Sequence, residues 1–213
     1  KTGFIEGNGT YYKQPRTEIR PRPQYSFDGR IYAVASSEDS IVSAAKLGAH
    51  IIMFADRPWE MRLPAIERGR ALHREYHGTE PPPVLLTEFV VCSNDLAQCE
   101  EEARQYQGKF VESNFHHYEF LGDHFKDVKG YDSYQQKAEI ARSAGHEGAV
   151  DGFMKAASWG TPDKILQGLE ERRKLLGDFE LNVSFRFGGT PYQVSERGLK
   201  LFAKEVLPVL KSW

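Results

Sequence analysis

The chain has 213 residues, of which 40% are hydrophobic and 27% are charged, so it can bury a substantial core, most simply as a single domain over residues 1–213. A formal net charge of -2 and the lack of a long basic run give no electrostatic basis for binding nucleic acid or an anionic membrane surface. The sequence contains no apolar segment of membrane-spanning length and no signal-peptide core, and its two cysteines do not make a disulfide framework, so the cytoplasm is the expected location.

The first predicted strand, residues 30–35, ends in a serine-rich turn that leads into a helix over residues 41–47. Unpaired backbone N–H groups and the positive end of the helix dipole make such a turn suitable for an anion, and the hydroxyls of Ser36 and Ser37 add donors for phosphate oxygens. Ser36 with Asp39 also matches an S-x-x-D capping box, which would satisfy the same N–H groups without a ligand. The local sequence leaves both interpretations open.

Two further strand and helix pairs follow. The second strand, residues 49–55, is almost entirely apolar, as expected for a strand buried on both faces, and its helix is predicted over residues 58–76. The third strand is predicted over residues 84–92, and Asn94 or Asp95 then caps a helix that extends to about residue 121.

Glycines interrupt the pattern over residues 122–160, which predicts an irregular insertion with short helices such as residues 134–143 and 150–157. The scarcity of regular apolar repeats is typical of a lid that orders on ligand binding, but a static packed excursion fits equally well. Regular structure resumes at Thr161, the predicted N-cap of a helix that ends near Leu176. The fourth strand, residues 180–187, precedes a last helix from about Val194.

Four strands that alternate with helices predict a parallel α/β sheet with right-handed crossovers. Four such units are half of a (β/α)8 barrel, and an open doubly wound sheet is the alternative. The barrel is favoured because no G-x-G-x-x-G motif follows any of the strands. In both architectures the functional site lies beyond the carboxyl ends of the strands.

Several segments, in this order and at these separations, resemble the carboxyl-terminal half of bacterial luciferase-like flavin-dependent monooxygenases. They are residues 19–23 leading to 31–37, residues 44–48, the helix start at 160–163 and the tail at 201–208. The resemblance covers roughly residues 4 to 211 and implies a TIM-barrel fold with an insertion before the last unit. The four predicted strands would then be the fifth to eighth of the barrel, and the first four would be absent from this sequence.

The resemblance also implies a chemistry. Family members bind reduced FMN, or a deazaflavin in one branch, and the expected activity is the oxygenation of a small organic substrate with O2. The implied partners are a flavin reductase and the missing amino-terminal half of the barrel, which would supply the catalytic residues, and a homo-oligomer is expected. A deazaflavin-dependent oxidoreductase and a non-catalytic flavoprotein or structural half-barrel subunit are the alternatives.

The family pattern carries over best onto Ser36 and Ser37, whose counterparts contact the flavin phosphate in several members. Arg57 follows the second strand and is a candidate to pair with phosphate or substrate, although a surface pair with Asp56 explains it as well. Phe54 is a candidate to line the ring or substrate pocket.

Two other features of the sequence have a plain structural interpretation beside the functional one. The Gly188-Gly189 turn is a further candidate for the ring or substrate pocket because glycine permits close backbone approach, but a plain turn explains it too. His116 and His117 are adjacent, so on a helix they point about 100° apart and do not chelate one metal ion as an i, i+4 pair does. The sequence therefore predicts no metal site.

Overall fold

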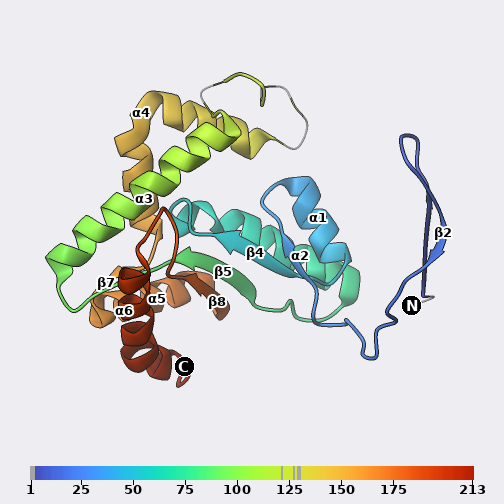
Figure 1. Ribbon diagram of the computed structural model, residues 1–213. Coiled ribbons are helices and arrows are strands. Elements are labelled where there is room, and N and C mark those ends of the chain that lie inside the picture. The colour runs from blue at the N-terminus through green and yellow to red at the C-terminus, as the bar shows by residue number, and fades with distance from the viewer. Residues whose placement is uncertain (1–2, 121, 127, 129–130) are drawn as a thin grey trace.

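A parallel sheet of four strands, in the spatial order β3-β4-β5-β8, forms the centre of the protein (Figure 1). The computed structural model describes residues 3–120, 122–126, 128 and 131–213. The four strands are β3 (Tyr32–Val34), β4 (His50–Phe54), β5 (Val84–Phe89) and β8 (Phe179–Ser184). The predicted α/β class with a parallel sheet is therefore confirmed.

Helices cover one face of this sheet. Helix α1 (Glu38–Lys46) joins β3 to β4, and α2 (Leu63–His77), which follows a 3-10 turn at Trp59–Met61, joins β4 to β5. Helix α5 (Pro162–Leu176) leads into β8, and its N-cap is Thr161, as the sequence predicts. Met53 of β4 and Leu86 of β5 are almost fully buried beneath α2 and α5. Burying one side chain of this size stabilises the fold by about 1.5–3 kcal/mol.

The other face of the sheet is partly exposed. Successive residues of a strand point to opposite faces, so Tyr32, Val34 and Phe54 alternate with the residues that pack against the helices. Their exposed fractions are 45%, 58% and 41%. In the described part of the chain, the outer strands β3 and β8 each pair with only one neighbour in this sheet. This face and these two edges therefore remain available for another layer of protein.

The expected third strand over residues 84–92 is divided in two. β5 ends at Phe89, and β6 (Val91–Cys92) pairs instead with β7 (Trp159–Gly160), a strand that the sequence analysis did not predict. The division occurs because the Val90 amide donates to the Ser184 carbonyl, while the next amide, of Val91, donates to the Ser158 carbonyl. The chain thus exchanges one strand partner for another within two residues.

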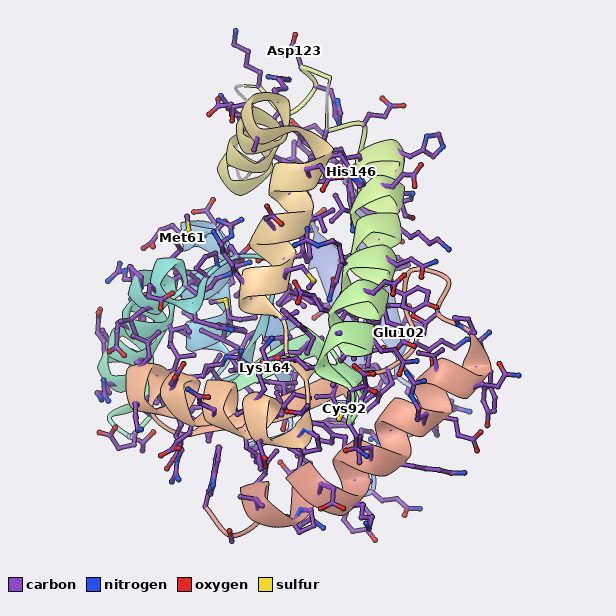
Figure 2. The ribbon with its side chains drawn as sticks, turned by 90° about the vertical axis from the view of Figure 1, so that its left-hand side faces the viewer. Met61, Cys92, Glu102, Asp123, His146 and Lys164 are labelled. Carbon is purple, nitrogen blue, oxygen red and sulfur yellow. The ribbon has the colours of Figure 1, made fainter. Side chains whose placement is uncertain are left out.

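Two long helices stand on the carboxyl side of the sheet (Figure 2). They are α3 (Leu96–Tyr118) and α4 (Asp132–Ala156), which lie side by side, with His146 Nε2 3.2 Å from the Gly108 carbonyl oxygen. The helices expected near residues 134–143 and 150–157 both lie in α4, which is two helical stretches that meet at a kink with non-helical dihedrals at Gly145 (φ 67°, ψ -172°). Residue 121, at the predicted end of the third helix, and residues 127, 129 and 130 of the predicted insertion lie outside the described residues.

The two ends of the chain add smaller elements. At the amino end, β1 (Phe4–Asn8) and β2 (Lys13–Glu18) form an antiparallel hairpin that was not predicted and that extends away from the sheet (Figure 1). At the carboxyl end, α6 (Tyr192–Leu201) starts two residues before the expected position, immediately after Pro191. It continues as a π-helical turn (Phe202–Val206) and the short α7 (Leu207–Leu210).

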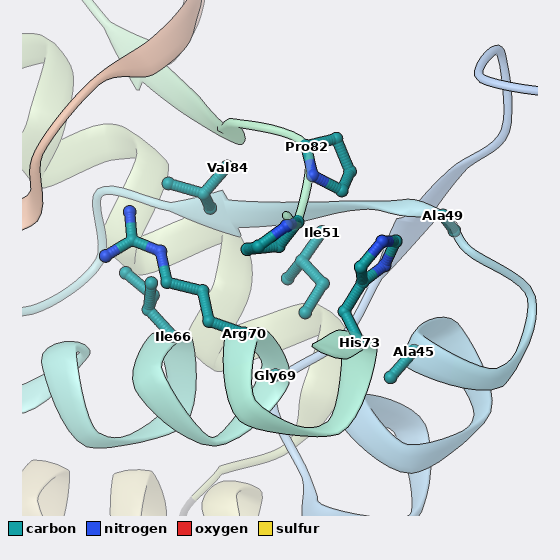
Figure 3. Close-up of a pocket in the computed structure, with 10 residues that line it drawn as sticks. Ala45, Ala49, Ile51, Ile66, Gly69, Arg70, His73, Pro82 and Val84 are labelled. Carbon is teal, nitrogen blue, oxygen red and sulfur yellow. The ribbon is translucent and has the colours of Figure 1, made fainter. Parts of the chain in front are cut away.

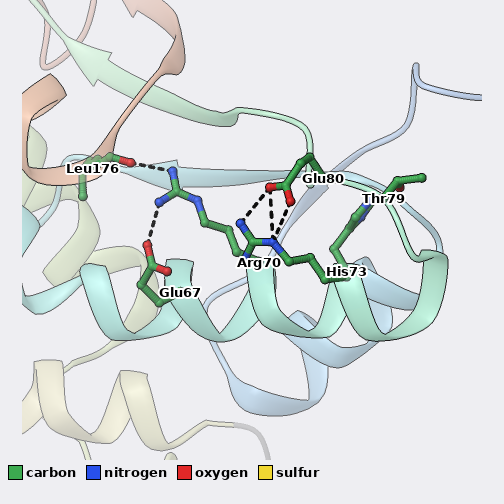
Figure 4. A network of polar contacts seen from close by, with 7 residues as sticks. Glu67, Arg70, His73, Thr79, Glu80 and Leu176 are labelled. Carbon is green, nitrogen blue, oxygen red and sulfur yellow. Dashed lines mark hydrogen bonds and ion pairs between the residues drawn. The ribbon is translucent and has the colours of Figure 1, made fainter.

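Helix α2 is tied to its surroundings by packing and by polar contacts. A void of about 20 Å³ between α2 and β4, lined by Ile51, Gly69 and His73, has room for little more than one water molecule (Figure 3). Arg70 donates to Glu67 and, at 2.5 Å, to the Leu176 carbonyl, which joins α2 to the end of α5 (Figure 4).

Among the described residues, no helix has both the length and the apolar character needed to cross a membrane.

Candidate functional site

A cavity of about 430 Å³ opens where β4 and β5 end, between the sheet and the pair α3 and α4. Phe54, Thr87 and Phe89 form its sheet wall, because the carboxyl ends of parallel strands lie at one edge. Phe110 of α3 and Phe153 of α4 belong to the opposite wall. The volume lies within the range of sites for organic ligands.

The aromatic side chains of the cavity support one another. The ring centroid of Phe89 lies 4.5 Å from that of Phe110 and 4.7 Å from that of Phe187. Phe110 in turn meets Phe153 edge to face at 5.6 Å. Such contacts stabilise beyond simple area burial and fix the orientation of the rings. The sequence carries no local signal for this wall, because its contacts join segments far apart in the chain.

A charged cluster lies at one side of the cavity, just after β4. The side chains of Asp56 and Arg62 are 8% and 7% exposed and form an ion pair. Arg57 Nε lies 3.5 Å from the same Asp56 carboxylate, and its side chain is 17% exposed. Burial lowers the pKa of Arg57, and the charge of Arg62 adds to this effect, whereas Asp56 opposes it. Two guanidinium groups therefore share one carboxylate.

The structure brings together two of the residues that the sequence singled out. Phe54 and Arg57 both line the cavity. Ser36 and Ser37 lie where β3 leads into α1, outside the lining of this cavity. The strands β3 and β4 are neighbours, so this turn is at the same edge of the sheet.

The expected capping box of Ser36 with Asp39 is wrong by one residue. The N-cap of α1 is Ser37, whose hydroxyl accepts from the Ser40 amide at 3.4 Å. The Ser40 hydroxyl accepts in return from the amides of Ser36 and Ser37, at 3.1 and 3.0 Å. The capping box therefore has the expected three-residue spacing but is formed by Ser37 and Ser40, one position later than predicted. The exposed Ser36 hydroxyl has no hydrogen-bond partner among the described residues.

The Gly188-Gly189 turn packs against α3 and is not part of the cavity lining. Both glycines have positive φ, 53° and 74°. A Cβ at Gly188 would lie 2.1 Å from the Tyr106 carbonyl oxygen, whereas a Cβ at Gly189 would meet only Lys109, at 4.0 Å. Gly188 therefore lets the chain approach the backbone of α3, the helix that carries Phe110.

A buried polar network below the cavity was not foreseen. Glu88 of β5 is fully buried, accepts from the Ser158 hydroxyl and pairs with Arg172 of α5. Burial raises the pKa of Glu88, while Arg172 and Ser158 act in the opposite direction. Arg172 also lies over the Trp59 ring, 5.2 Å from its centroid. The only available signal was a glutamate in the middle of an apolar strand.

Both cysteines are buried, and neither is placed as a reactive thiol. Burial raises the pKa of Cys92 to about 12 and of Cys99 to about 11, so both are neutral thiols at physiological pH. The described residues include no group of three or more His, Cys, Asp or Glu side chains placed to hold a metal ion.

An aromatic cavity beyond the carboxyl ends of a parallel sheet defines a class of α/β proteins that bind organic ligands or cofactors at that edge. The family model described as luciferase-like monooxygenase matches residues 2–178. The chain belongs to this family, whose fold is a TIM barrel.

Solved structures with the same fold have low sequence identity to the chain. The monooxygenase RslO1 from Streptomyces bottropensis is 20% identical, with a TM-score of 0.60 over 97% of this chain and 56% of that one. An F420-dependent secondary alcohol dehydrogenase in complex with an F420-acetone adduct is 15% identical, with a TM-score of 0.61 over 98% and 57%. The oxygenating constituent of 3,6-diketocamphane monooxygenase from Pseudomonas putida, in complex with FMN, is 14% identical, with a TM-score of 0.55 over 96% and 57%.

These similarities have a limited extent. The chain spans about half the length of the three solved structures named above. No curated protein gives a significant match.

Proposed function

We propose that the chain is part of a flavin-dependent monooxygenase that uses reduced FMN and O2 to oxygenate a small organic substrate. The observation that carries the proposal is the aromatic cavity at the carboxyl edge of the sheet, in a member of the luciferase-like family. Bound reduced flavin supplies two electrons, so that one oxygen atom of O2 enters the substrate and the other leaves as water. The chain's own residues hold the cofactor, exclude water and orient the substrate.

The proposed phosphate site is the turn at Ser36 and Ser37. The exposed Ser36 hydroxyl and the positive end of α1 are suited to an anion. Glu38 would repel a phosphate, but its carboxylate accepts from Arg68 Nε at 2.9 Å, and this contact offsets its charge. The Ser36 hydroxyl and the amino end of α1 support the assignment of this turn to the phosphate of FMN.

The proposed ring site is the sheet wall of the cavity, where Phe54 and Phe89 offer apolar contact to a planar ring system. We propose that the Gly188-Gly189 turn acts indirectly by seating α3, which carries the opposite wall. Arg57 lines the same cavity and is suited to pair with phosphate or substrate.

We further propose that the chain supplies the last four β/α units of a barrel, as a single domain over residues 1–213, with residues 122–160 as an insertion over the cavity. The exposed sheet face with Tyr32 and Val34, and the outer strands β3 and β8, support this arrangement. The amino-terminal half would cover that face and supply further site residues. A flavin reductase, a homo-oligomeric state and a cytoplasmic location complete the proposal.

A deazaflavin-dependent oxidoreductase is the second candidate. The F420-dependent secondary alcohol dehydrogenase matches this chain with a TM-score as high as that of the monooxygenase RslO1. The two candidates differ in a simple assay: the monooxygenase consumes O2 when given reduced FMN and a substrate, whereas the alternative transfers hydride between deazaflavin and substrate without O2. Absence of binding to both cofactors would contradict both candidates.

Single alanine variants test the phosphate site, because the structure gives the two serines different roles. In the native assembly, Ser36→Ala should weaken FMN binding by about 1–3 kcal/mol, roughly five- to a hundredfold, without loss of stability. Ser37→Ala removes the N-cap as well, so it should also lower the free energy of unfolding by about 0.5–2 kcal/mol.

Riboflavin, which lacks the phosphate, is the control ligand and should bind wild type and Ser36→Ala equally. Affinities from fluorescence titration and melting curves on the same samples separate the two effects. Equal losses for FMN and riboflavin would remove Ser36 from the site.

A further inference from the structure

The wall of the cavity formed by α3 and α4 consists mainly of rings. Phe110 and Phe115 come from α3 and Phe153 from α4, and Tyr118 and Tyr134 lie further along the same wall. Phe110 and Phe153 meet edge to face, so both ring faces and ring edges line the space. A flat aromatic ligand matches such a surface better than a sugar or polyol, whose hydroxyls would be left without partners.

Arg57 gives the same cavity an electrostatic preference. Asp56 is already in direct contact with Arg62, and Arg57 Nε lies 3.5 Å from the same carboxylate. A largely buried guanidinium with a shared counter-ion carries an uncompensated desolvation cost. A carboxylate or enolate on the ligand would relieve this cost through charge-assisted hydrogen bonds to the end of the Arg57 fork.

We propose that the cavity binds an aromatic substrate with one acidic group, its rings against α3 and α4 and its acidic group on Arg57. The proposal rests on the proposed function in that this ligand is the molecule to be oxygenated. The sheet wall with Phe54 stays available to the flavin ring, so the two ligands occupy opposite walls of one cavity.

A glycine on α4, Gly152, is a position where a larger side chain would occupy part of the cavity. Gly152 lines it, and a Cβ added there would meet no atom within 4 Å. The backbone therefore accepts a side chain at this position, and the further atoms of a leucine would occupy part of the cavity. Gly168 of α5 is a matched control, because its Cβ position is equally open but it lines a different surface groove.

The test uses three probes and the purified protein in its native assembly with FMN present: 2-naphthoate, its neutral methyl ester, and octanoate, which has the charge without the rings. Calorimetric titration should show 2-naphthoate binding more tightly than octanoate. Arg57→Gln should weaken 2-naphthoate by about ten- to a hundredfold and leave the ester almost unchanged, and Arg57→Lys should retain part of the affinity.

Gly152→Leu should weaken 2-naphthoate and its ester alike, by about tenfold or more, while Gly168→Leu should leave both unchanged. Equal binding of octanoate and 2-naphthoate would overturn the aromatic part of the proposal. Equal losses of acid and ester in Arg57→Gln would overturn the acidic part.

Flavin titrations on the same variants distinguish this proposal from the proposed function. If Arg57→Gln weakens FMN but neither riboflavin nor 2-naphthoate, then Arg57 serves the cofactor phosphate and the substrate assignment is wrong. If 2-naphthoate behaves as expected but neither FMN nor a deazaflavin binds, the proposed function fails and the assignment of the cavity stands.

Discussion

At the scale of single residues, Gly188 is the position near the site where an added Cβ would clash most severely. Alanine at Gly188 would combine a positive φ with a direct clash against the Tyr106 carbonyl, whereas alanine at Gly189 has only the positive φ. We expect Gly188→Ala to lower the free energy of unfolding by about 2–5 kcal/mol and Gly189→Ala by about 1–2 kcal/mol. Urea unfolding of the two variants measures the difference, and similar losses would show that the contact with α3 is unimportant.

Site features marked by a local sequence pattern could be predicted, whereas contacts between residues far apart in the chain could not. Phe54 and Arg57 were singled out because a strand end followed by polar residues is a local pattern; both line the cavity, and their role in binding stays a prediction. Glu88 and Arg172 are 84 positions apart, so their pairing has no local signature. The shift of the cap from Ser36 to Ser37 has a similar cause, since three nearby serines allow two registers and the sequence does not choose between them.

At the scale of elements, α2 carries a histidine that couples its packing to pH. His73 is 8% exposed, and burial, with smaller effects from His77 and Arg74, lowers its pKa below the ordinary value of 6.5, while Glu80 opposes this. The folded state therefore binds a proton less readily than the unfolded state. The stability that this histidine contributes is present above pH 6.5 and is lost as the pH falls through the folded-state pKa.

We expect His73→Gln to flatten the decline of melting temperature between pH 7 and about pH 5. The exposed His116 is the control, and His116→Gln should leave the pH profile unchanged. Melting curves over this pH range provide the measurement. If His73→Gln and the wild type show the same dependence of melting temperature on pH, the decline is caused by other groups.

The pair α3 and α4 is the element on which the proposed lid depends. Gly145 interrupts α4 with φ 67°, and a Cβ there would meet nothing within 4 Å, so the break does not result from crowding. We expect amides of α4 before Gly145 to exchange hydrogen faster than those after it, and to slow when flavin binds. Exchange that is slow along all of α4 without flavin, and unchanged by it, would favour a static insertion.

Elements with strong local signals were predicted well. Strands β3, β4 and β8 and helices α1 and α5 fall within three residues of their expected positions, because caps such as Thr161 mark their ends. Helix α2 ends at the left-handed Gly78 as expected but begins five residues late, at Leu63, because a 3-10 turn precedes it. The two-residue strand β7 and the hairpin of β1 and β2 were missed, and β6 was predicted only as a continuation of β5. Strands this short, or this polar, show too little alternation to be recognised, and only their pairing defines them.

At the scale of the whole molecule, the sheet has one well-packed face and one face that is partly open to solvent. Val34 and Phe54 on the open face are more than 40% exposed, and β3 and β8 present outer edges within the described part of the chain. Exposed apolar strands with free edges promote association. The proposed amino-terminal half of the barrel would cover both the face and the edges, which links the stability of the chain to the completeness of its site.

We therefore expect residues 1–213 expressed alone to be aggregated or molten, and co-expression with the amino-terminal half to restore solubility. Size-exclusion chromatography measures aggregation, near-ultraviolet circular dichroism measures fixed side-chain packing, and dye binding measures exposed apolar surface.

Val34→Lys should improve the solubility of the isolated chain but prevent assembly with the other half, because it places a charge where the barrel interior would close. Leu47→Lys, at a position 62% exposed beyond the end of α1, is the matched control and should affect neither property. A monodisperse isolated chain that melts cooperatively would refute the half-barrel arrangement, and it would leave the cavity between the sheet and α3 and α4 as a site that the chain forms by itself.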